Sequence, residues 1–322
     1  MPPLRIAMWD YDRVRPLMDG RVTILGCELQ VEVRYPGSHA FRTAENATLD
    51  LMELSFSSYM AECSRGAPAF IALPVFPSRM FRHSAIYVRS DAAIASPRHL
   101  IGRRVGAPLY GQTAVLAARG VLQDDYGVRP SDLEWVVGPL EPGEARAPLR
   151  RPAAEVSMIE SGDKPLDAML LDGELDALFT AAAPASFRRR DPRVRRLWPD
   201  VRAAERSWFE RTGVFPIMHV LGLRAELARE RPDLPAAIGR AFEQARRLAM
   251  EALDGQSGAS KVILPWASLE LEEARALMGE DFWSYGVEAN RSTIETMASW
   301  SFDQGLSARL TTPEILFPLE PS

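Results

Sequence analysis

Short apolar runs of strand length alternate with helix-like segments along nearly the whole chain, and this alternation constrains the fold more than any other feature. LRIAMW (4–9) is a short, largely apolar run of strand length, and CELQVEVRY (27–35) alternates apolar and polar positions as a strand does. GQTAVLAARGVLQDDYG (111–127) is typical of a helix that ends at Gly127. Alternating strands and helices predict an α/β protein with a mostly parallel sheet covered by helices. The chain has 322 residues, about twice the common size of one domain, so we expect two lobes.

The order of the predicted strands indicates where the chain passes from one lobe to the other. We expect a discontinuous first lobe, made of residues 1–90 and 207–322, and a second lobe made of residues 91–206. RRVGAP (103–108) is the predicted opening strand of the second lobe, and VFPIMHVLGLR (214–224) is the strand that returns to the first. Other segments with clear patterns are strand-like runs at 69–76, 83–89 and 133–138, helices at 235–253 and 269–278, and a loop at 139–152.

Charge and composition indicate a small-molecule partner. The net charge is −5 and no long run of Lys or Arg occurs, which argues against nucleic acid or an anionic membrane surface. No stretch approaches the roughly 20 apolar residues that span a bilayer. Lys164 and Lys261 are the only lysines, so arginine carries nearly all the positive charge. Arginine suits the capture of carboxylates, although a codon bias explains the same composition.

The cysteines and the first residues predict a cytoplasmic protein. Cys27 and Cys63 are the only cysteines, and two isolated thiols form neither a CxxC pair nor a disulfide framework. The N-terminal segment is interrupted by charged side chains, among them Arg5, Asp10 and Asp12, so it contains no apolar core of a signal peptide.

The four histidines are scattered through the sequence. They are His39, His83, His99 and His219, and no HxH, HExxH or clustered carboxylate pattern accompanies them. Phosphate-binding glycine loops and the GxSxG motif are also absent from the sequence. We therefore expect neither a metal nor a cofactor. His219 stands in an otherwise apolar strand, where it either faces a ligand or forms hydrogen bonds within the core.

Three basic side chains cluster between two predicted strands. Arg79, Arg82 and His83 lie within five residues, where one strand ends and the next begins, and ligand sites of α/β lobes form at such ends. A second candidate is the start of the helix at 111–127, where Gln112 and Thr113 stand beside backbone N–H groups that favour an anion. The alternatives are a solvated loop for the first group and an ordinary N-cap for the second.

Further candidates lie on the first strands. Glu53, Ser55 and Ser57 occupy alternate positions and so point to one side, although the serines also suit helix capping. Trp9 and Tyr11 follow the first strand and could stack on a ring or bond a hydroxyl, although Trp9 also suits the core.

Eight stretches, which follow one another in order over almost the whole length of the chain, carry a resemblance to a known family. They are WDYDR (9–13), ELSFSSYM (53–60), LPVFPSRMFRHS (73–84), RVGAPLYGQTA (104–114), ARGVLQDDYGV (118–128), TGVFPIMHV (212–220), DFWSYGVEANR (281–291) and QGLSARL (304–310). With these stretches the chain resembles the 4,5-dihydroxyphthalate decarboxylase family. The resemblance implies the type II periplasmic-binding-protein-like fold, in which two α/β lobes enclose a ligand cleft. It also implies decarboxylation of a hydroxylated aromatic carboxylate in aromatic catabolism, without a cofactor.

Two segments depart from the pattern that this resemblance leads us to expect. Leu116 and Ala117 stand where a tryptophan is expected, and GPLEPGEARA (138–147) lacks an expected pair of glycines. Both departures are expected where the second lobe meets the ligand, so the substrate is the least constrained part of the prediction.

The implied chemistry assigns a role to each candidate residue. The ring carbon that loses the carboxylate must take a proton, and a ring hydroxyl must release electrons toward it. Arg79 and Arg82 would hold carboxylates, and His83 would deliver the ring proton. His219 would be the partner acid or base, and Glu53 would take the hydroxyl proton. The substrate would also contact the other candidates, which are Gln112, Thr113, Ser57, Trp9 and Tyr11.

Two other functions stay open. A cytoplasmic solute-binding or ligand-sensing protein for an aromatic carboxylate would share the fold and leave its ligand unchanged. A relative of the proteins of thiamine pyrimidine synthesis would share it too, but the cysteine-rich, histidine-dependent motif expected there is absent from the sequence. The sequence also leaves a homo-oligomer open.

Overall fold

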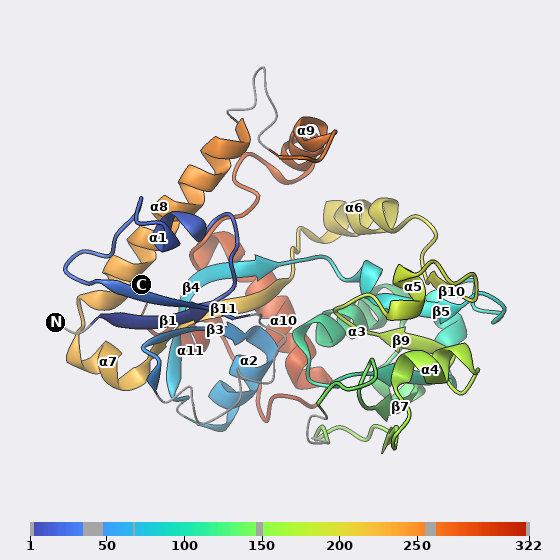
Figure 1. Cartoon of the computed structure of the whole chain (residues 1–322). Helices are drawn as coiled ribbons and strands as arrows, with labels where there is room; N and C mark the ends of the chain where they lie inside the picture. Colours follow the sequence, from blue (N-terminus) through green and yellow to red (C-terminus); the bar gives the residue numbers. More distant parts are fainter. Residues whose placement is uncertain (1–2, 35–47, 67, 146–150, 255–261, 320–322) are drawn as a thin grey trace.

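Two β-sheets lie side by side in the computed structural model, which describes residues 3–34, 48–66, 68–145, 151–254 and 262–319 (Figure 1). The first sheet has the strand order β2-β1-β3-β11-β4 and the second β10-β5-β9-β6-β7-β8. The strands of the first sheet are β1 (Leu4–Met8), β2 (Leu29–Val33), β3 (Leu51–Ser55), β4 (Phe70–Arg79) and β11 (Ile217–Arg224). Those of the second are β5 (Ile86–Arg89), β6 (Arg104–Ala107), β7 (Glu134–Val137), β8 (Met158–Glu160), β9 (Ala177–Phe179) and β10 (Val194–Arg196).

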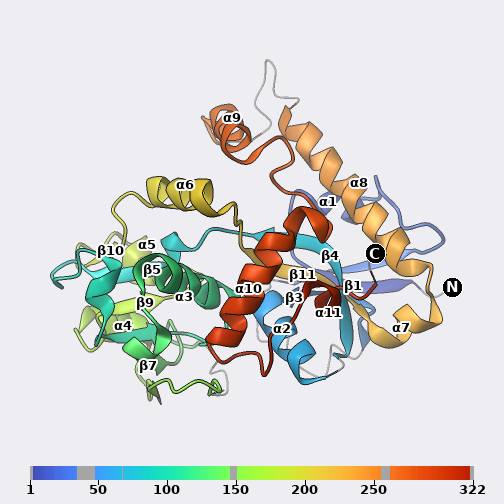
Figure 2. The same cartoon turned by 180° about the vertical axis from the view of Figure 1, so that it is seen from behind.

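Helices cover both sheets, as the α/β prediction requires (Figures 1 and 2). They are α1 (Arg15–Met18), α2 (Phe56–Arg65), α3 (Thr113–Tyr126), α4 (Leu166–Leu171), α5 (Ala185–Arg188), α6 (Val201–Thr212), α7 (Ala225–Glu230), α8 (Leu234–Asp254), α9 (Ala267–Met278), α10 (Arg291–Asp303) and α11 (Pro313–Leu316). In the described part of the chain, no helix combines the length and the apolar character needed to cross a membrane.

Each sheet mixes parallel and antiparallel strands. In the first sheet β1 is parallel to β2 and β3, whereas β11 is antiparallel to both of its neighbours, β3 and β4. In the second sheet β6 to β9 form parallel pairs, and β5 runs antiparallel to β9 and β10. The expectation of a mostly parallel sheet was therefore wrong for β11 and β5, because an apolar pattern carries no information about strand direction.

Each sheet has apolar cores of its own. Ile6, Leu51 and Leu221 of the first sheet pack with Phe242 of α8 on one face, and Phe56 of α2 and Val220 belong to the core on the other. Two further cores belong to the second sheet, one with buried residues of α3 and one with those of α4. The two sheets make the protein two-lobed, and the core around Phe56 also contains residues of α3 such as Leu116.

The chain crosses between the sheets through two short connections. The first is the 3-10 helix His83–Ala85, which joins β4 to β5, and the second includes α6, which leads from the second sheet to β11. The predicted first lobe extends to residue 90, but the hydrogen bonds of β5 place residues 86–89 in the second sheet. A four-residue strand-like run fits either sheet, since only its partners decide where it belongs. The remaining lobe limits stay a prediction.

Helix α3 is the main contact of the second lobe with the first. Its first ten residues, Thr113 to Leu122, are buried, and it ends at Gly127, whose φ of 67° is the left-handed conformation that glycine adopts most easily. Gly120 lies against α10, where an added Cβ would come within 2.1 Å of the Trp300 ring. Close packing therefore requires glycine at this position.

Candidate active site

Four predicted residues converge at the ends of β1, β3 and β11. Glu53 Oε1 lies 2.6 Å from His219 Nδ1, and the Tyr11 hydroxyl donates to the same oxygen at 2.8 Å. The second oxygen, Oε2, accepts the backbone N–H of Trp9 at 3.2 Å. Antiparallel pairing places His219 opposite Ser55, two residues after Glu53, so sheet register brings the acid and the histidine to one face.

In the Glu53–His219 pair the acid is buried and the histidine is partly exposed to solvent. The Glu53 side chain is fully buried, whereas 20 % of the His219 side chain is exposed. Burial, followed by the neighbouring carboxylate, raises the pKa of Tyr11 well above its usual value, so Tyr11 keeps its proton and donates it. The imidazole is therefore oriented by a buried acid through Nδ1, which leaves Nε2 as the nitrogen for a ligand.

A cluster of hydroxyl groups joins the two lobes beside this pair. Thr113 Oγ1 lies 2.9 Å from Ser55 Oγ and accepts the backbone N–H of Ser57 at 3.2 Å. Ser57 Oγ donates to the carbonyl of Gly111 at 2.6 Å. Gln112 is the N-cap residue of α3, and its Oε1 is buried without a hydrogen-bond partner among the described residues. The cluster thus brings the start of α3 next to the face of β3 and β11 that holds Glu53 and His219.

Two further residues of this site were not among the predicted ones. The Arg13 guanidinium stacks on the Tyr11 and Trp283 rings, 4.2 Å from each centroid, and Nε donates to the Pro77 carbonyl at 2.7 Å. Ser78 pairs with His219 across β4 and β11. WDYDR holds Arg13 two residues from Tyr11, but no spacing in the sequence indicates its contact with Trp283.

Arg79 is held by polar groups of the first lobe. Its Nη1 donates to Asn290 Oδ1 at 2.7 Å and its Nη2 to the Phe215 carbonyl at 2.8 Å. Nε is buried without a hydrogen-bond partner, and no carboxylate of the described residues lies within ion-pair distance of this guanidinium. Burial lowers the pKa of Arg79 to about 9, so it remains a cation near neutral pH.

Arg82 and His83 lie where the chain first crosses between the lobes. Arg82 Nε donates to Met218 Sδ at 3.0 Å, next to His219 in β11. The His83 ring packs against Trp198 and Trp208, with centroid distances of 4.9 and 5.8 Å, and its Nδ1 is buried without a partner among the described residues. Burial lowers the pKa of His83 to about 4, so the ring is neutral near pH 7.

The predicted residues therefore fall into two groups. Trp9, Tyr11, Glu53 and His219 form one site, to which the hydroxyl cluster adds Ser57, Gln112 and Thr113. Arg79, Arg82 and His83 are held by other contacts, along the end of β4 and the crossover that follows.

The two segments that depart from the expected pattern differ in position. Leu116 and Ala117 are fully buried in the core that α3 shares with the first lobe, so they pack against protein. Residues 146 and 147 of the other segment lie outside the described residues.

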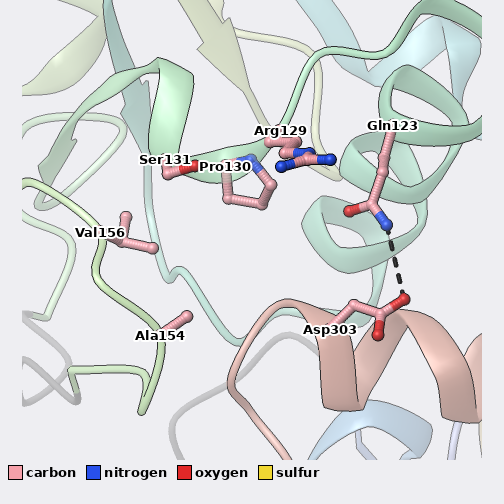
Figure 3. A pocket seen from close by; sticks show the side chains of 7 residues that line it. All are labelled: Gln123, Arg129, Pro130, Ser131, Ala154, Val156 and Asp303. Carbon is pink, nitrogen blue, oxygen red and sulfur yellow. Dashed lines mark hydrogen bonds between the residues drawn. The ribbon is translucent and has the colours of Figure 1, made fainter.

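The described residues offer no cluster of metal ligands. Within the ranges that the structure describes, no three His, Cys, Asp or Glu side chains are grouped so that they could hold a metal ion. A hollow of about 410 Å³ lies between the end of α3 and α10 (Figure 3). It is lined by Gln123, Arg129, Pro130, Ser131, Ala154, Val156 and Asp303, none of which is a predicted site residue.

Comparison with solved structures concerns the fold alone. A putative periplasmic sulfonate-binding protein from Methylobacillus flagellatus matches 99 % of this chain and 94 % of its own, with a TM-score of 0.56 and 14 % identity. An alkanesulfonate-binding protein from Xanthomonas axonopodis pv. citri, bound to MOPS, matches 98 % and 97 % with a TM-score of 0.53 and 12 % identity. These likenesses confirm the predicted periplasmic-binding-protein-like fold.

Comparison with characterised sequences identifies the family. No protein-family model matches the chain. A 4,5-dihydroxyphthalate decarboxylase of Comamonas testosteroni is 41 % identical over 317 residues, 98 % of this chain and 96 % of that protein. Another, from Pseudomonas putida, is 38 % identical over 208 residues, 64 % of this chain and 81 % of that protein. Because the first match covers nearly all of both proteins, the chain belongs to the 4,5-dihydroxyphthalate decarboxylase family.

Proposed function

We propose that this protein decarboxylates a hydroxylated aromatic carboxylate of the 4,5-dihydroxyphthalate type in aromatic catabolism, without a cofactor. The observation that carries the proposal is the Glu53–His219 pair, a buried acid 2.6 Å from a partly exposed imidazole beside the hydroxyls of both lobes. Family membership supplies the substrate class.

The proposed reaction replaces the bond between a ring carbon and its carboxylate with a carbon–hydrogen bond. A ring hydroxyl para to the departing carboxylate releases electron density, the ring carbon takes a proton, and the carbon–carbon bond then breaks. The bond electrons return to the ring and CO₂ leaves. With 4,5-dihydroxyphthalate the product is 3,4-dihydroxybenzoate, and the proton taken by the ring balances the charge that the lost carboxylate carried.

We assign proton delivery to His219 rather than to His83. Glu53 holds Nδ1 of His219, so Nε2 can present a proton to the ring while the buried carboxylate stabilises the imidazolium form. His83 has its pKa lowered to about 4 and is neutral near pH 7, which makes it a poor source of a proton. Its contacts with Trp198 and Trp208 suit a residue that packs the crossover.

The carboxylates of the substrate would meet two favourable regions. One is the start of α3, where the Thr113 hydroxyl lies beside that of Ser55 and the helix dipole favours an anion. The other is the end of β4 and the start of β11, where Arg79 brings a buried cation without a protein carboxylate and Arg82 contacts Met218. A dianion placed between them would gain from both, and lobe closure would exclude water.

The location of the reaction is part of the proposal. Cys27 and Cys63 are both free thiols, which suits a reducing compartment, and we propose that the protein acts in the cytoplasm.

The test is incubation of the purified protein with 4,5-dihydroxyphthalate and with hydroxybenzoates, in water and in D₂O, after exhaustive treatment with a chelator. We expect CO₂ and 3,4-dihydroxybenzoate in equal amounts, with one deuterium at the vacated ring carbon in D₂O. Tight binding of every compound in the panel without release of CO₂ would contradict the proposal and favour a binding protein. Loss of turnover on chelation would leave decarboxylation but overturn its independence of metal.

A further inference from the structure

A buried arginine of α3 takes no part in the proposed reaction. Arg119 is 1 % exposed, and its guanidinium lies over the rings of Tyr110 and Trp135, with Cζ 3.7 and 5.3 Å from their centroids. Its Nε donates to Gln304 Oε1 at 2.7 Å, and its Nη1 donates to the Tyr110 carbonyl at 2.8 Å. Nη2 is buried without a hydrogen-bond partner among the described residues. The side chain is therefore held by two of its three nitrogen atoms.

The positive charge of Arg119 is not balanced by the part of the chain that the structure describes. Its two acceptors are an amide oxygen and a backbone carbonyl, and no described carboxylate forms an ion pair with it. Burial lowers the pKa of Arg119 to about 10, so the guanidinium stays positive near neutral pH. Buried charges in proteins are nearly always paired. This buried cation therefore favours a negative charge nearby that the chain itself does not provide.

The guanidinium lies beside the start of α3, although Arg119 is in the middle of the helix. Side chains of a helix lean toward its N-terminus, and this one reaches back to the Tyr110 carbonyl, two residues before the N-cap Gln112. The next carbonyl, that of Gly111, accepts the Ser57 hydroxyl of the first lobe. Arg119 thus holds the segment through which the second lobe meets the first. Its charge adds to the partial positive charge of the helix start.

Gln304, the C-cap residue of α10, connects Arg119 to a second element. Gln304 Nε2 donates to the Leu116 carbonyl at 3.2 Å, and the Tyr110 hydroxyl donates to the Gln304 carbonyl at 3.3 Å. Tyr110, Arg119 and Gln304 therefore form one buried network, and loss of the guanidinium would take a donor from two buried acceptors. The network keeps the charge at a fixed distance from the start of α3.

We propose that Arg119 is a positioning residue for the substrate, whose buried charge and hold on Tyr110 favour a carboxylate at the start of α3. The inference rests on the proposed function, which places one carboxylate of the substrate there. Each negative charge of a ligand should gain from the guanidinium, because a buried charge is screened only weakly. The carboxylate that stays on the ring keeps its charge throughout the reaction. Arg119 should therefore lower KM and have little effect on kcat.

The test measures the binding of three ring compounds to the full chain near neutral pH by titration calorimetry. The compounds are phthalate, with two negative charges, benzoate, with one, and catechol, with none. Arg119→Met should weaken benzoate binding about 10-fold and phthalate binding by a larger factor, with little change for catechol. Arg119→Lys keeps the charge and should recover most of this loss. Arg129→Met is the matched control, because it removes an exposed arginine just beyond the other end of α3, and it should bind all three compounds as the wild type does.

A second variant keeps the test decisive if Arg119→Met does not fold, which circular dichroism would show. Gln304→Glu places a carboxylate against Arg119 Nε and neutralises the charge while the guanidinium keeps its contacts, although the bond to the Leu116 carbonyl is lost. This variant should also weaken phthalate more than benzoate and leave catechol unchanged. With 4,5-dihydroxyphthalate, KM should rise in both variants while kcat changes by less than about 3-fold.

Equal weakening of all three compounds in a folded variant would assign Arg119 a structural role only and overturn the inference. Affinities that none of the variants changes would overturn it too, and so would a wild type that binds neither phthalate nor benzoate. Turnover is measured separately. A wild type that releases no CO₂ from 4,5-dihydroxyphthalate, while the variants bind the anions in the expected order, would overturn the proposed function and leave the role of Arg119 in anion binding intact.

Discussion

Glu53 is the residue on which the proposed chemistry depends. Its carboxylate lies within hydrogen-bond distance of His219, Tyr11 and the backbone of Trp9, so its position is fixed by two other segments, the residues after β1 and strand β11. A fixed and buried acid can orient the imidazole and stabilise its charge at the same moment.

Replacing Glu53 should therefore affect turnover more than binding. Glu53→Gln keeps the shape of the side chain but removes its charge, and kcat should fall by about 10²- to 10⁴-fold with little change in KM. Steady-state kinetics checks this. Glu205→Gln is the control, because Glu205 is another partly buried carboxylate, which accepts the Ser84 N–H on the crossover. A similar fall in kcat in both variants would show that loss of any buried acid is sufficient.

His83 should make stability depend on pH. Its pKa is about 4 in the folded protein and about 6.5 in the unfolded chain, so the unfolded chain binds the proton more tightly. The resulting stabilisation is present above about pH 6.5 and is lost as pH falls toward 4. Between about pH 7 and about pH 5 this single group should cost about 2 kcal/mol.

Urea unfolding at these two pH values measures the effect. The Gln side chain of His83→Gln does not titrate. Between about pH 7 and about pH 5, the free energy of unfolding of this variant should therefore fall by about 2 kcal/mol less than that of the wild type. An identical fall in both proteins would mean that His83 does not titrate between its folded and unfolded states as we expect.

The sequence predicted correctly which way a side chain points where the alternation of side chains along a strand decides it. Glu53 and Ser55 lie on alternate positions and do face one side, and His219 stands in a strand that does return to the first sheet. The convergence of Tyr11, Glu53 and His219 depends on the order β1-β3-β11, which no local pattern contains. The burial that keeps His83 neutral depends on Trp198 and Trp208, more than 110 residues away in sequence.

At the scale of elements, the contact of α3 with α10 holds the lobes together. Trp300 is fixed in place, since its Nε1 donates to Asp124 at 2.8 Å and its ring covers Gly120. The ring has little room to move when the neighbouring position changes.

Gly120→Ala should therefore destabilise the protein by about 1 to 3 kcal/mol through overpacking. The matched change is Gly239→Ala in α8, where an added Cβ meets nothing within 4 Å and where alanine should stabilise the helix by up to about 1 kcal/mol. Thermal unfolding of the two variants should move in opposite directions. An unchanged melting temperature for Gly120→Ala would mean that the interlobe packing adapts.

The elements themselves were predictable to different degrees. The strands β1, β6, β7 and β11 and the helices α3, α8 and α9 lie where periodicity and breakers predict them. Helices α6 and α10 were missed: α6 has Trp208 as its single buried residue, whereas the buried positions of α10, such as Ile294, Met297 and Ser301, do have the spacing of a helix. The sheet to which β5 belongs was also missed, because pairing is a property of distant segments.

For the whole molecule, a ligand held between the lobes should stabilise both. Phthalate has the two carboxylates but lacks the ring hydroxyls, so we expect it to bind without reacting. The melting temperature should rise with phthalate concentration. At a concentration about one hundred times the dissociation constant, the free energy of unfolding should increase by about 2.7 kcal/mol. Benzoate, with one carboxylate, should do less. Equal effects of the two would argue against two anion-binding regions.

The place of β11 in the first sheet has a consequence for synthesis of the chain. β11 separates β3 from β4, yet its residues 217–224 leave the ribosome after every strand of the second sheet. Until then β3 and β4 each lack a partner along one edge, and unpaired edges promote association with other chains. The strands of the second sheet can therefore pair first. The first sheet, which contains Glu53, is completed only when β11, which contains His219, has been synthesised. Assembly of the Glu53–His219 pair and completion of the first sheet are then a single, late step of folding.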